Sequence, residues 1–194
     1  MKNLHIALIA TILIFALKAP VQANLIDRGS GLIYDDDLNI TWLQDANLSG
    51  ATMTWLAATS WADSLVFQGF DDWRLPVSDS SCTGNSCTES ELGHIFYNEA
   101  ITSDSSGLFQ NVKPSIYWSA SEYEIDPSQS WRFSLKYGTQ GTSSKETARY
   151  AWAVRTGDVT PPVAPEPVSS ILFLTGGTVL AIKRYKGKKV TFNS

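Results

Sequence analysis

Residues 72–76 read Asp72-Trp73-Arg74-Leu75-Pro76. Opposite charges stand on either side of a large aromatic residue, and the proline that follows cannot donate a backbone hydrogen bond to a continuing strand. An arginine guanidinium can bind a carboxylate through two hydrogen bonds and can pack against an aromatic ring at the same time. We therefore expect this stretch to pin a loop that leaves a helix, and we favour that structural role over direct contact with a ligand.

The residues on either side of this stretch predict two helices. Upstream, Thr54 is a suitable N-cap, and apolar residues recur at helical spacing up to an expected end near Gly69; they are Trp55, Ala58, Ala62, Leu65 and Val66. Downstream, Thr88 and Glu91 have the spacing of a capping box. The shorter helix that follows would present Leu92, Ile95 and Phe96 on one face.

Strands are predicted on both sides of the helical region. Residues 32–34 and 40–43 flank a polar, turn-forming segment, which indicates a hairpin. Residues 130–137 and 150–155 alternate in character with period two, as half-buried antiparallel strands do, and turn residues follow at 138–141. The sequence thus predicts an α+β domain over residues 24–158, in which two helices pack on twisted antiparallel strands.

Several short motifs occur in the order of a known family. They are Gly31-Leu32-Ile33-Tyr34, Thr41-Trp42, Asp72-Trp73-Arg74-Leu75-Pro76, Glu91-Leu92, Tyr117-Trp118-Ser119-Ala120-Ser121 and Ala153-Val154-Arg155. The region resembles the Lcl C-terminal domain family, found at the end of a bacterial collagen-like adhesin. The resemblance implies a C-type-lectin-like fold, in which the first and last strands pair. It also marks residues 72–76, Trp118 and Arg155 as a structural signature.

All seven tryptophans lie within residues 24–158. Most of them occupy apolar stripes, so filling of the core is the main interpretation, and a platform that stacks on sugars is the alternative. The segment from Trp118 to Trp131 also contains polar serines and is expected to be a long exposed connection. Tyr117, Trp118, Tyr123 and Trp131 are therefore the candidate ligand-contacting residues.

Two cysteines, Cys82 and Cys87, enclose Thr-Gly-Asn-Ser. In an exported chain a disulfide is the default, and closing so short a loop would stabilise the domain by about 2 kcal/mol. A metal or redox site is the alternative. It would need more ligands, because His94 is the only histidine after residue 23 and faces no obvious cysteine on its predicted helix. No metal site is therefore predicted.

The segment Asp35-x-Asp37-x-Asn39 spaces three oxygen-bearing side chains as an EF-hand loop does. However, Ile40 stands where the loop needs glycine, and Ala46 stands where it needs glutamate. The sugar-binding tripeptides of the lectin family are absent as well, which argues against calcium-dependent sugar binding. A charged hairpin turn is the main interpretation, a structural calcium ion is the alternative, and no other cofactor is predicted.

Catalytic constellations are poorly represented. Nucleophilic catalysis needs a serine or cysteine with a histidine base and an orienting acid, and one histidine is a weak start. The adjacent acids at 71–72 and the pair Glu122 and Glu124 are typical of solvated loops. The formylglycine-generating enzymes, which share the implied fold, use a reactive cysteine pair that Cys82 and Cys87 do not match. We expect no enzymatic activity, with a hydrolase or oxidase as the alternative.

Charge is unevenly distributed along the chain. Residues 24–158 hold 8 Lys+Arg and 18 Asp+Glu, so 8 − 18 = −10, against −4 for the whole chain. Nucleic acid is therefore not an expected partner. The adhesin domain that names the family binds sulfated glycosaminoglycans, but this domain should repel a polyanion within a Debye length of about 8 Å. Arg132 and Lys136 share one strand face and Lys145 and Arg149 follow, which gives only a small basic patch.

Residues 1–23 have the features of a secretory signal peptide. Lys2 precedes an apolar stretch from Ile6 to Leu17, and Val21-Gln22-Ala23 supplies the small-residue cleavage pattern. Twelve apolar residues span only about 18 Å as a helix, which is short for the alternative, a permanent anchor. We expect cleavage after Ala23.

The other end of the chain has a tripartite pattern. A linker at residues 159–167 contains four of the eight prolines, and residues 168–182 are apolar; the basic cluster that follows is Lys183, Arg184, Lys186, Lys188 and Lys189. With Pro165-Glu166-Pro167 in front, residues 165–189 resemble the PEP-CTERM sorting tail. In that family the tail is read by an exosortase, a membrane peptidase of Gram-negative bacteria that make extracellular polysaccharide. A plain single-pass anchor is the alternative.

These features together predict a protein that passes through an inner-membrane intermediate to the cell surface or extracellular matrix of a Gram-negative bacterium. Its expected role is recognition or scaffolding of extracellular polysaccharide. The alternative is a passive envelope protein without a specific ligand.

Overall fold

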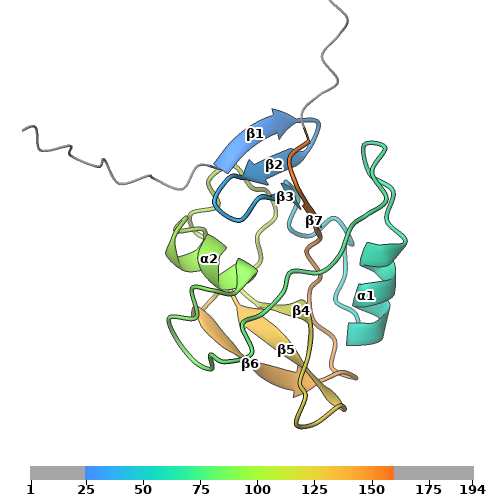
Figure 1. Cartoon of the computed structure of the whole chain (residues 1–194), viewed down its shortest axis with the longest axis vertical. Coiled ribbons are helices and arrows are strands. Elements are labelled where there is room, and N and C mark those ends of the chain that lie inside the picture. Colours follow the sequence, from blue (N-terminus) through green and yellow to red (C-terminus); the bar gives the residue numbers. More distant parts are fainter. Residues whose placement is uncertain (1–24, 160–194) are drawn as a thin grey trace, which may run out of the picture.

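Seven strands form two separate antiparallel sheets in the computed structural model, which describes residues 25–159 (Figure 1). One sheet has the strand order β1-β2-β3-β7, and the other has the order β4-β5-β6. The bounds are β1 Leu25–Gly29, β2 Leu32–Asp35, β3 Ile40–Leu43, β4 Ile116–Glu122, β5 Gln129–Ser134, β6 Thr139–Ser144 and β7 Val154–Thr156. The two helices of this region are α1 Trp55–Asp63 and α2 Glu91–Tyr97. The predicted α+β class is therefore confirmed.

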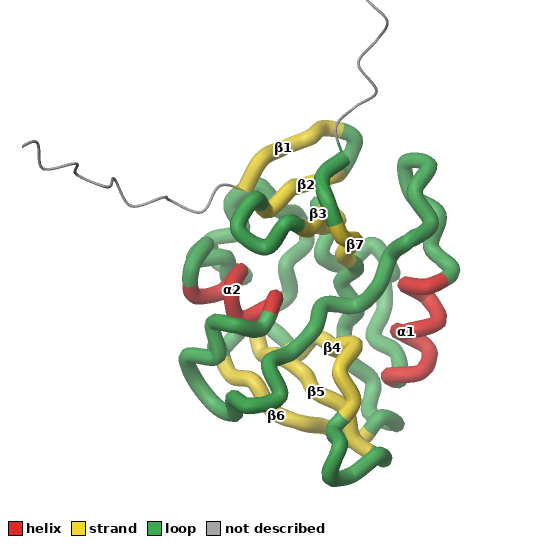
Figure 2. Tube along the Cα trace, in the orientation of Figure 1, coloured by secondary structure: helices red, strands yellow, loops and turns green. Residues whose placement is uncertain are grey.

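The two sheets lie at opposite ends of the domain, and α1 and α2 lie on opposite sides of it (Figure 1). Long loops connect these short elements and make up much of the chain trace (Figure 2). Neither helix of the described region is long and apolar enough to cross a membrane. The predicted signal peptide, the linker beyond Val159 and the sorting tail lie outside the described residues.

The predicted hairpin at 32–43 is confirmed, because β2 and β3 pair antiparallel with Asp35 opposite Ile40. Two expectations about this sheet are wrong. The strand β1 adds to the outer edge of β2, so the last strand pairs with the third strand, β3, and not with the first. The last strand is also shorter than 150–155, since only Val154–Thr156 continues the ladder.

The second sheet is a meander of three strands. The segment 118–131, expected as an exposed connection, is largely the β4–β5 hairpin. The predicted strand at 130–137 ends at Ser134. The chain then turns through Gly138, whose positive φ of 67° favours glycine, and this turn leaves the Tyr137 side chain exposed.

Both helices begin at a side-chain cap, one as predicted and one not. Thr54 caps α1, where its Oγ1 accepts a hydrogen bond from the Ala57 N–H at 3.4 Å. The helix ends at Asp63, earlier than expected, so Val66 lies beyond it and is exposed. For α2 the capping box at Thr88 is wrong: Ser90 is the N-cap and accepts from the Gly93 N–H at 3.0 Å.

An aromatic core lies within the domain. Trp42 and Phe109 both contact Trp152, each with ring centroids 4.8 Å apart. The Trp152 indole N–H donates to the Leu43 carbonyl at 2.7 Å, so its one polar group is satisfied inside the core. Five of the seven tryptophans are buried, which confirms core filling for them; they are Trp42, Trp73, Trp118, Trp131 and Trp152.

Candidate functional site

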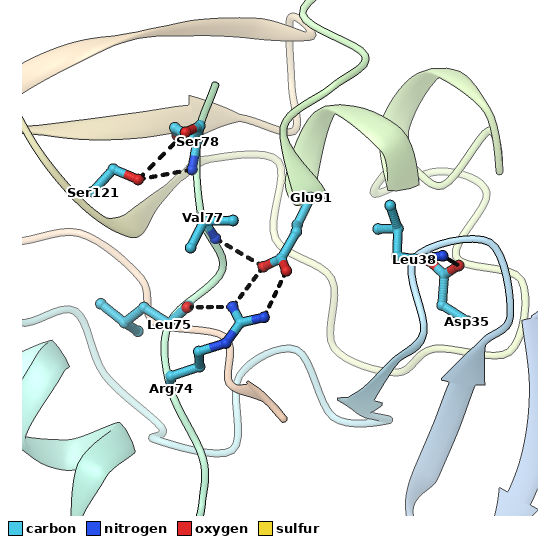
Figure 3. Close-up of polar contacts among 8 residues, drawn as sticks. All are labelled: Asp35, Leu38, Arg74, Leu75, Val77, Ser78, Glu91 and Ser121. Atoms are coloured by element: carbon cyan, nitrogen blue, oxygen red, sulfur yellow. Dashed lines mark hydrogen bonds and ion pairs between the residues drawn. The ribbon is translucent and has the colours of Figure 1, made fainter. Parts of the chain in front are cut away.

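The signature stretch is held to α2 by an ion pair between Arg74 and Glu91 (Figure 3). Two guanidinium nitrogens of Arg74 donate to the two carboxylate oxygens of Glu91 at 2.7 and 2.8 Å. The Val77 N–H donates to the same carboxylate at 2.8 Å, and the Glu91 side chain is only 10% exposed. Arg74 thus joins the loop to the helix, with Glu91 as its partner in place of Asp72.

Asp72 is joined instead to β7. The Arg155 side chain donates to both of its carboxylate oxygens, at 2.7 and 3.0 Å, and these hydrogen bonds hold the pKa of Asp72 below its usual range. Between the two ion pairs, Trp73 and Leu75 are buried. Arg74 and Val154 exchange backbone hydrogen bonds in both directions at 2.8 Å. The signature residues therefore fix residues 72–76 to α2 on one side and to β7 on the other, and their charged groups are mainly used in these contacts.

The same loop continues to the disulfide and to the second sheet. Ser121 of β4 accepts from the Ser78 N–H at 3.0 Å (Figure 3). Cys82 and Cys87 form the predicted disulfide, and the described residues contain no free cysteine. The Gln140 side chain in β6 donates to the Cys82 carbonyl at 2.6 Å, so the disulfide loop is attached to the sheet.

Most of the predicted ligand surface is buried, so that prediction is wrong for three of its four residues. Tyr117 and Trp118 have no exposed area, and Trp131 is 3% exposed. The Tyr117 hydroxyl accepts from the Lys113 N–H at 2.8 Å, and burial raises the pKa of this phenol above its ordinary range. Only Tyr123 is partly exposed, and it packs edge-on against Trp131.

A pocket of about 400 Å³ lies instead beside β5, lined by Arg132, Lys136, Tyr137 and several small or polar residues. Arg132 is partly buried without a carboxylate partner among the described residues. Its Nη1 donates to the Thr139 carbonyl over a long 3.4 Å, and its Nε has no partner. Burial and the nearby charge of Arg149 lower the pKa of Arg132. The positive charge of the Arg132 guanidinium is therefore not balanced by a carboxylate, which favours binding of an anion in the pocket.

The rim of this pocket carries an exposed aromatic ring. Tyr137 is 66% exposed, and the Lys136 ammonium lies 4.9 Å from the centre of its ring. A hydrogen bond to Tyr137 raises the pKa of Lys136. Of the four cations expected in the basic patch, Lys145 lies elsewhere, paired with Glu122 at 2.8 Å. Arg132, Lys136 and Arg149 remain as the patch.

These elements match a known family over most of the described domain. The model of the Lcl C-terminal domain matches residues 31–155. The chain belongs to this family. The match runs from the start of β2 into β7 and includes both helices and both signature ion pairs. None of the curated proteins matches the chain.

A polar cluster that sequence reasoning missed lies elsewhere in this Lcl C-terminal domain. Asp35 and Asp37, from the β2–β3 turn, lie near His94 of α2 and near Glu99, which follows that helix. Asn39 does not complete the EF-hand pattern, because its Oδ1 accepts from the Tyr34 hydroxyl at 2.9 Å. Within the described residues, the His94 ring nitrogens face Asn98 and three carboxylates but no serine or cysteine side chain, so the cluster does not have the composition of a catalytic triad.

Proposed function

We propose that this chain is an exported, non-enzymatic module that binds an acidic sugar unit of extracellular polysaccharide in the pocket at Arg132. The observation that supports the proposal most directly is a partly buried arginine without a carboxylate partner, beside a pocket with an exposed aromatic ring at its rim. Pockets for small ligands have volumes of roughly 300–1,000 Å³, and this one falls in that range.

The chemistry of the pocket suits a sugar that carries one anionic group. A guanidinium binds a carboxylate or sulfate through two parallel hydrogen bonds, and Lys136 adds a second positive charge. The Tyr137 ring offers an apolar face for stacking against a sugar ring. Ser134 and Thr139 line the same pocket and supply groups that can hydrogen-bond sugar hydroxyls.

The net charge of the domain limits the ligand further. With −10 over residues 24–158, the domain repels a densely charged chain at long range. This repulsion is weaker for a saccharide with isolated acidic units than for a heavily sulfated glycosaminoglycan. The proposed ligand is therefore a sparsely charged polysaccharide, and the dense polyanions bound by the adhesin domain are not favoured.

Binding is tested with the full chain, exported in a host so that the disulfide can form and purified in mild detergent. On an array of neutral, uronic-acid and sulfated saccharides, we expect retention of acidic sugars. Arg132→Gln should weaken binding at least about tenfold, and Tyr137→Ala should weaken it as well. Lys145→Gln removes the same charge outside the pocket and should leave binding unchanged. Absence of binding to every saccharide would favour a passive envelope protein.

The ends of the chain support the proposed location. The signal-peptide pattern at 1–23 and the tripartite pattern at 165–189 agree on export, with the domain outside the inner membrane. We propose that an exosortase cleaves near Pro165-Glu166-Pro167. We also propose that the α+β domain has a C-type-lectin-like fold. Cell fractionation with intact-mass analysis tests both cleavages. Deletion of residues 165–194 should release the domain to the periplasm or medium, and unchanged surface attachment would refute the tail assignment.

A further inference from the structure

Four ionisable side chains converge between the β2–β3 turn and the end of α2. The His94 Nε2 lies 3.6 Å from Glu99 Oε1, 3.8 Å from Asp35 Oδ2 and 4.0 Å from Asp37 Oδ2. One atom each from Asp37, His94 and Glu99 lies within 4.8 Å of the others. Separations of 3.6–4.0 Å are too long for hydrogen bonds, so these atoms surround a common point without bonding to one another.

Two of the converging atoms are buried and lack partners. Within the described region, His94 Nε2 and Glu99 Oε1 have no hydrogen-bond partner, and their side chains are 6% and 9% exposed. The Asp35 side chain is 1% exposed, and a hydrogen bond with the Trp42 side chain acts on its carboxylate. Leaving one such group unsatisfied costs about 1–3 kcal/mol, and more when the group is charged. Two such atoms facing one another, with the Asp37 carboxylate beside them, indicate that the site binds a ligand other than a protein side chain.

The electrostatics of the cluster indicate that this ligand is a cation. Asp35, Asp37 and Glu99 bring three carboxyl groups within 4.0 Å of His94 Nε2. Within the described region no lysine or arginine forms an ion pair with any of these three carboxyl groups. One protonated histidine offsets one of three carboxylate charges, whereas a divalent cation offsets two.

The outer nitrogen of the histidine ring is also held. His94 Nδ1 lies 2.9 Å from Nδ2 of the Asn98 side chain. The oxygen and nitrogen of that amide are interchangeable by rotation. For metal binding the Asn98 amide rotates by 180°, so that its oxygen faces Nδ1; the ring hydrogen then sits on Nδ1, and Nε2 presents its lone pair to the cluster. A second-shell hydrogen bond of this kind is usual for histidines that bind metals.

The geometry points to a binding site for a divalent transition-metal ion, Zn²⁺ being the fitting example, formed by Asp37, His94 and Glu99, with Asp35 on the buried side. An imidazole nitrogen with carboxylate oxygens suits Zn²⁺ better than Ca²⁺, which prefers oxygen ligands alone. Ligands of tetrahedral zinc at 2.0–2.2 Å lie about 3.4 Å apart. The distances from His94 Nε2 to Glu99 and Asp37, 3.6 and 4.0 Å, therefore need to shorten by about 0.2 and 0.6 Å. The two carboxylates lie within 4.8 Å of each other and need to approach by at most about 1.4 Å. Asp37 is 37% exposed and gives the ion a path from solvent.

Such an ion would act as a structural cross-link. It joins the β2–β3 turn to the last turn of α2 and to Glu99 beyond it, segments that are far apart in the sequence. The described cluster offers no adjacent nucleophile, so the site is assigned a role in stability. It is separate from the pocket at Arg132, and its test is independent of saccharide binding.

The test uses the full chain, exported, purified in mild detergent and stripped with chelator. Addition of ZnCl₂ should raise the melting temperature by about 5–10 °C when free zinc exceeds Kd a hundredfold. Elemental analysis after desalting should give one zinc per chain. Glu99→Gln and His94→Gln should abolish the rise. Glu89→Gln, an exposed change just before the same helix, should keep it. Asn98→Ala should weaken zinc binding about tenfold.

A direct readout covers the case in which the ligand variants fold poorly. In a chain carrying His5→Gln, His94 is the sole histidine, so its ring nitrogens give one pair of NMR signals. Zinc should shift the Nε2 signal. The inference is overturned if zinc leaves the wild-type melting temperature unchanged, if the rise persists in both ligand variants, if the ring signals do not move, or if Ca²⁺ stabilises the protein and zinc does not.

Discussion

Replacing Glu91 by glutamine should destabilise the domain far more than the same change at Glu122. Both glutamates form ion pairs of similar length, 2.7 Å with Arg74 and 2.8 Å with Lys145. They differ in burial, because the Glu91 side chain is 10% exposed and the Glu122 side chain is 55% exposed. The comparison therefore isolates the effect of burial on one chemical change.

The magnitude follows from the contacts that are lost. Glu91 accepts two hydrogen bonds from Arg74 and one from the Val77 N–H. A neutral amide keeps one oxygen for these donors and places an NH₂ group against the others. Disrupting a buried pair costs about 3–5 kcal/mol. Arg74 is 32% exposed and can recover some hydration, so we expect about 2–3 kcal/mol for Glu91→Gln. For Glu122→Gln we expect about 0–1 kcal/mol.

Thermal denaturation measures the difference. For the 135 residues at 25–159, the unfolding entropy near the midpoint is about 0.28 kcal/mol/K, so Glu91→Gln should lower the melting temperature by about 7–11 °C. Glu122→Gln should lower it by about 4 °C at most. Equal effects of the two changes would refute the claim that the Arg74–Glu91 pair fixes the loop to α2.

Three other perturbations have expected outcomes. Gly93→Ala would place a Cβ 1.8 Å from the Cys87 carbonyl oxygen, so urea denaturation should show a loss of about 3 kcal/mol or more; a loss below about 1 kcal/mol would mean the helix start can move. Reduction of the disulfide should cost about 2 kcal/mol, seen as a melting temperature about 7 °C lower with dithiothreitol, and an unchanged value would contradict the loop-entropy argument. Burial raises the pKa of Tyr117, so its contribution to stability is complete below the unfolded value near pH 10 and is lost as the pH rises above it. Urea midpoints between pH 9 and 11.5 should therefore fall less steeply in Tyr117→Phe than in the unchanged protein.

Local signals in the sequence predicted the elements whose determinants are themselves local. The hairpin at 32–43 and the Thr54 cap depend on residues within a few positions of each other, and both are confirmed. The cap of α2 was mispredicted because Glu91, which completes a capping box with Thr88 in the sequence, is bound by Arg74 across 17 positions. A local pattern does not contain that contact.

The candidate sites depended on long-range packing and were predicted less well. The alternation of Trp131 and Phe133 extended without a break to Tyr137, so the pattern placed Tyr137 on the buried face. In the structure the strand ends at Ser134, and the turn through Gly138 leaves the Tyr137 side chain exposed. Aromatic residues at 117–131 had the composition of a binding surface, but the β4–β5 hairpin packs them inward. The basic pair Arg132 and Lys136 was identified from spacing along one strand.

The helix α2 has seven residues, and a helix of this length has little stability of its own in water. The structure holds it at its first residue through Glu91 and in its middle through the cluster around His94. If α2 folds as one unit, loss of either attachment releases much of the helix. The second substitution then reduces the free energy of unfolding by less than it does on its own. Glu91→Gln combined with His94→Gln should thus lose at least about 0.5 kcal/mol less stability than the sum of the single changes, beyond the error of additivity. Glu91→Gln combined with Lys145→Gln, which touches neither attachment, should be additive. Additive losses in the first pair, measured by urea denaturation with and without zinc, would show that the attachments at Glu91 and at His94 act independently.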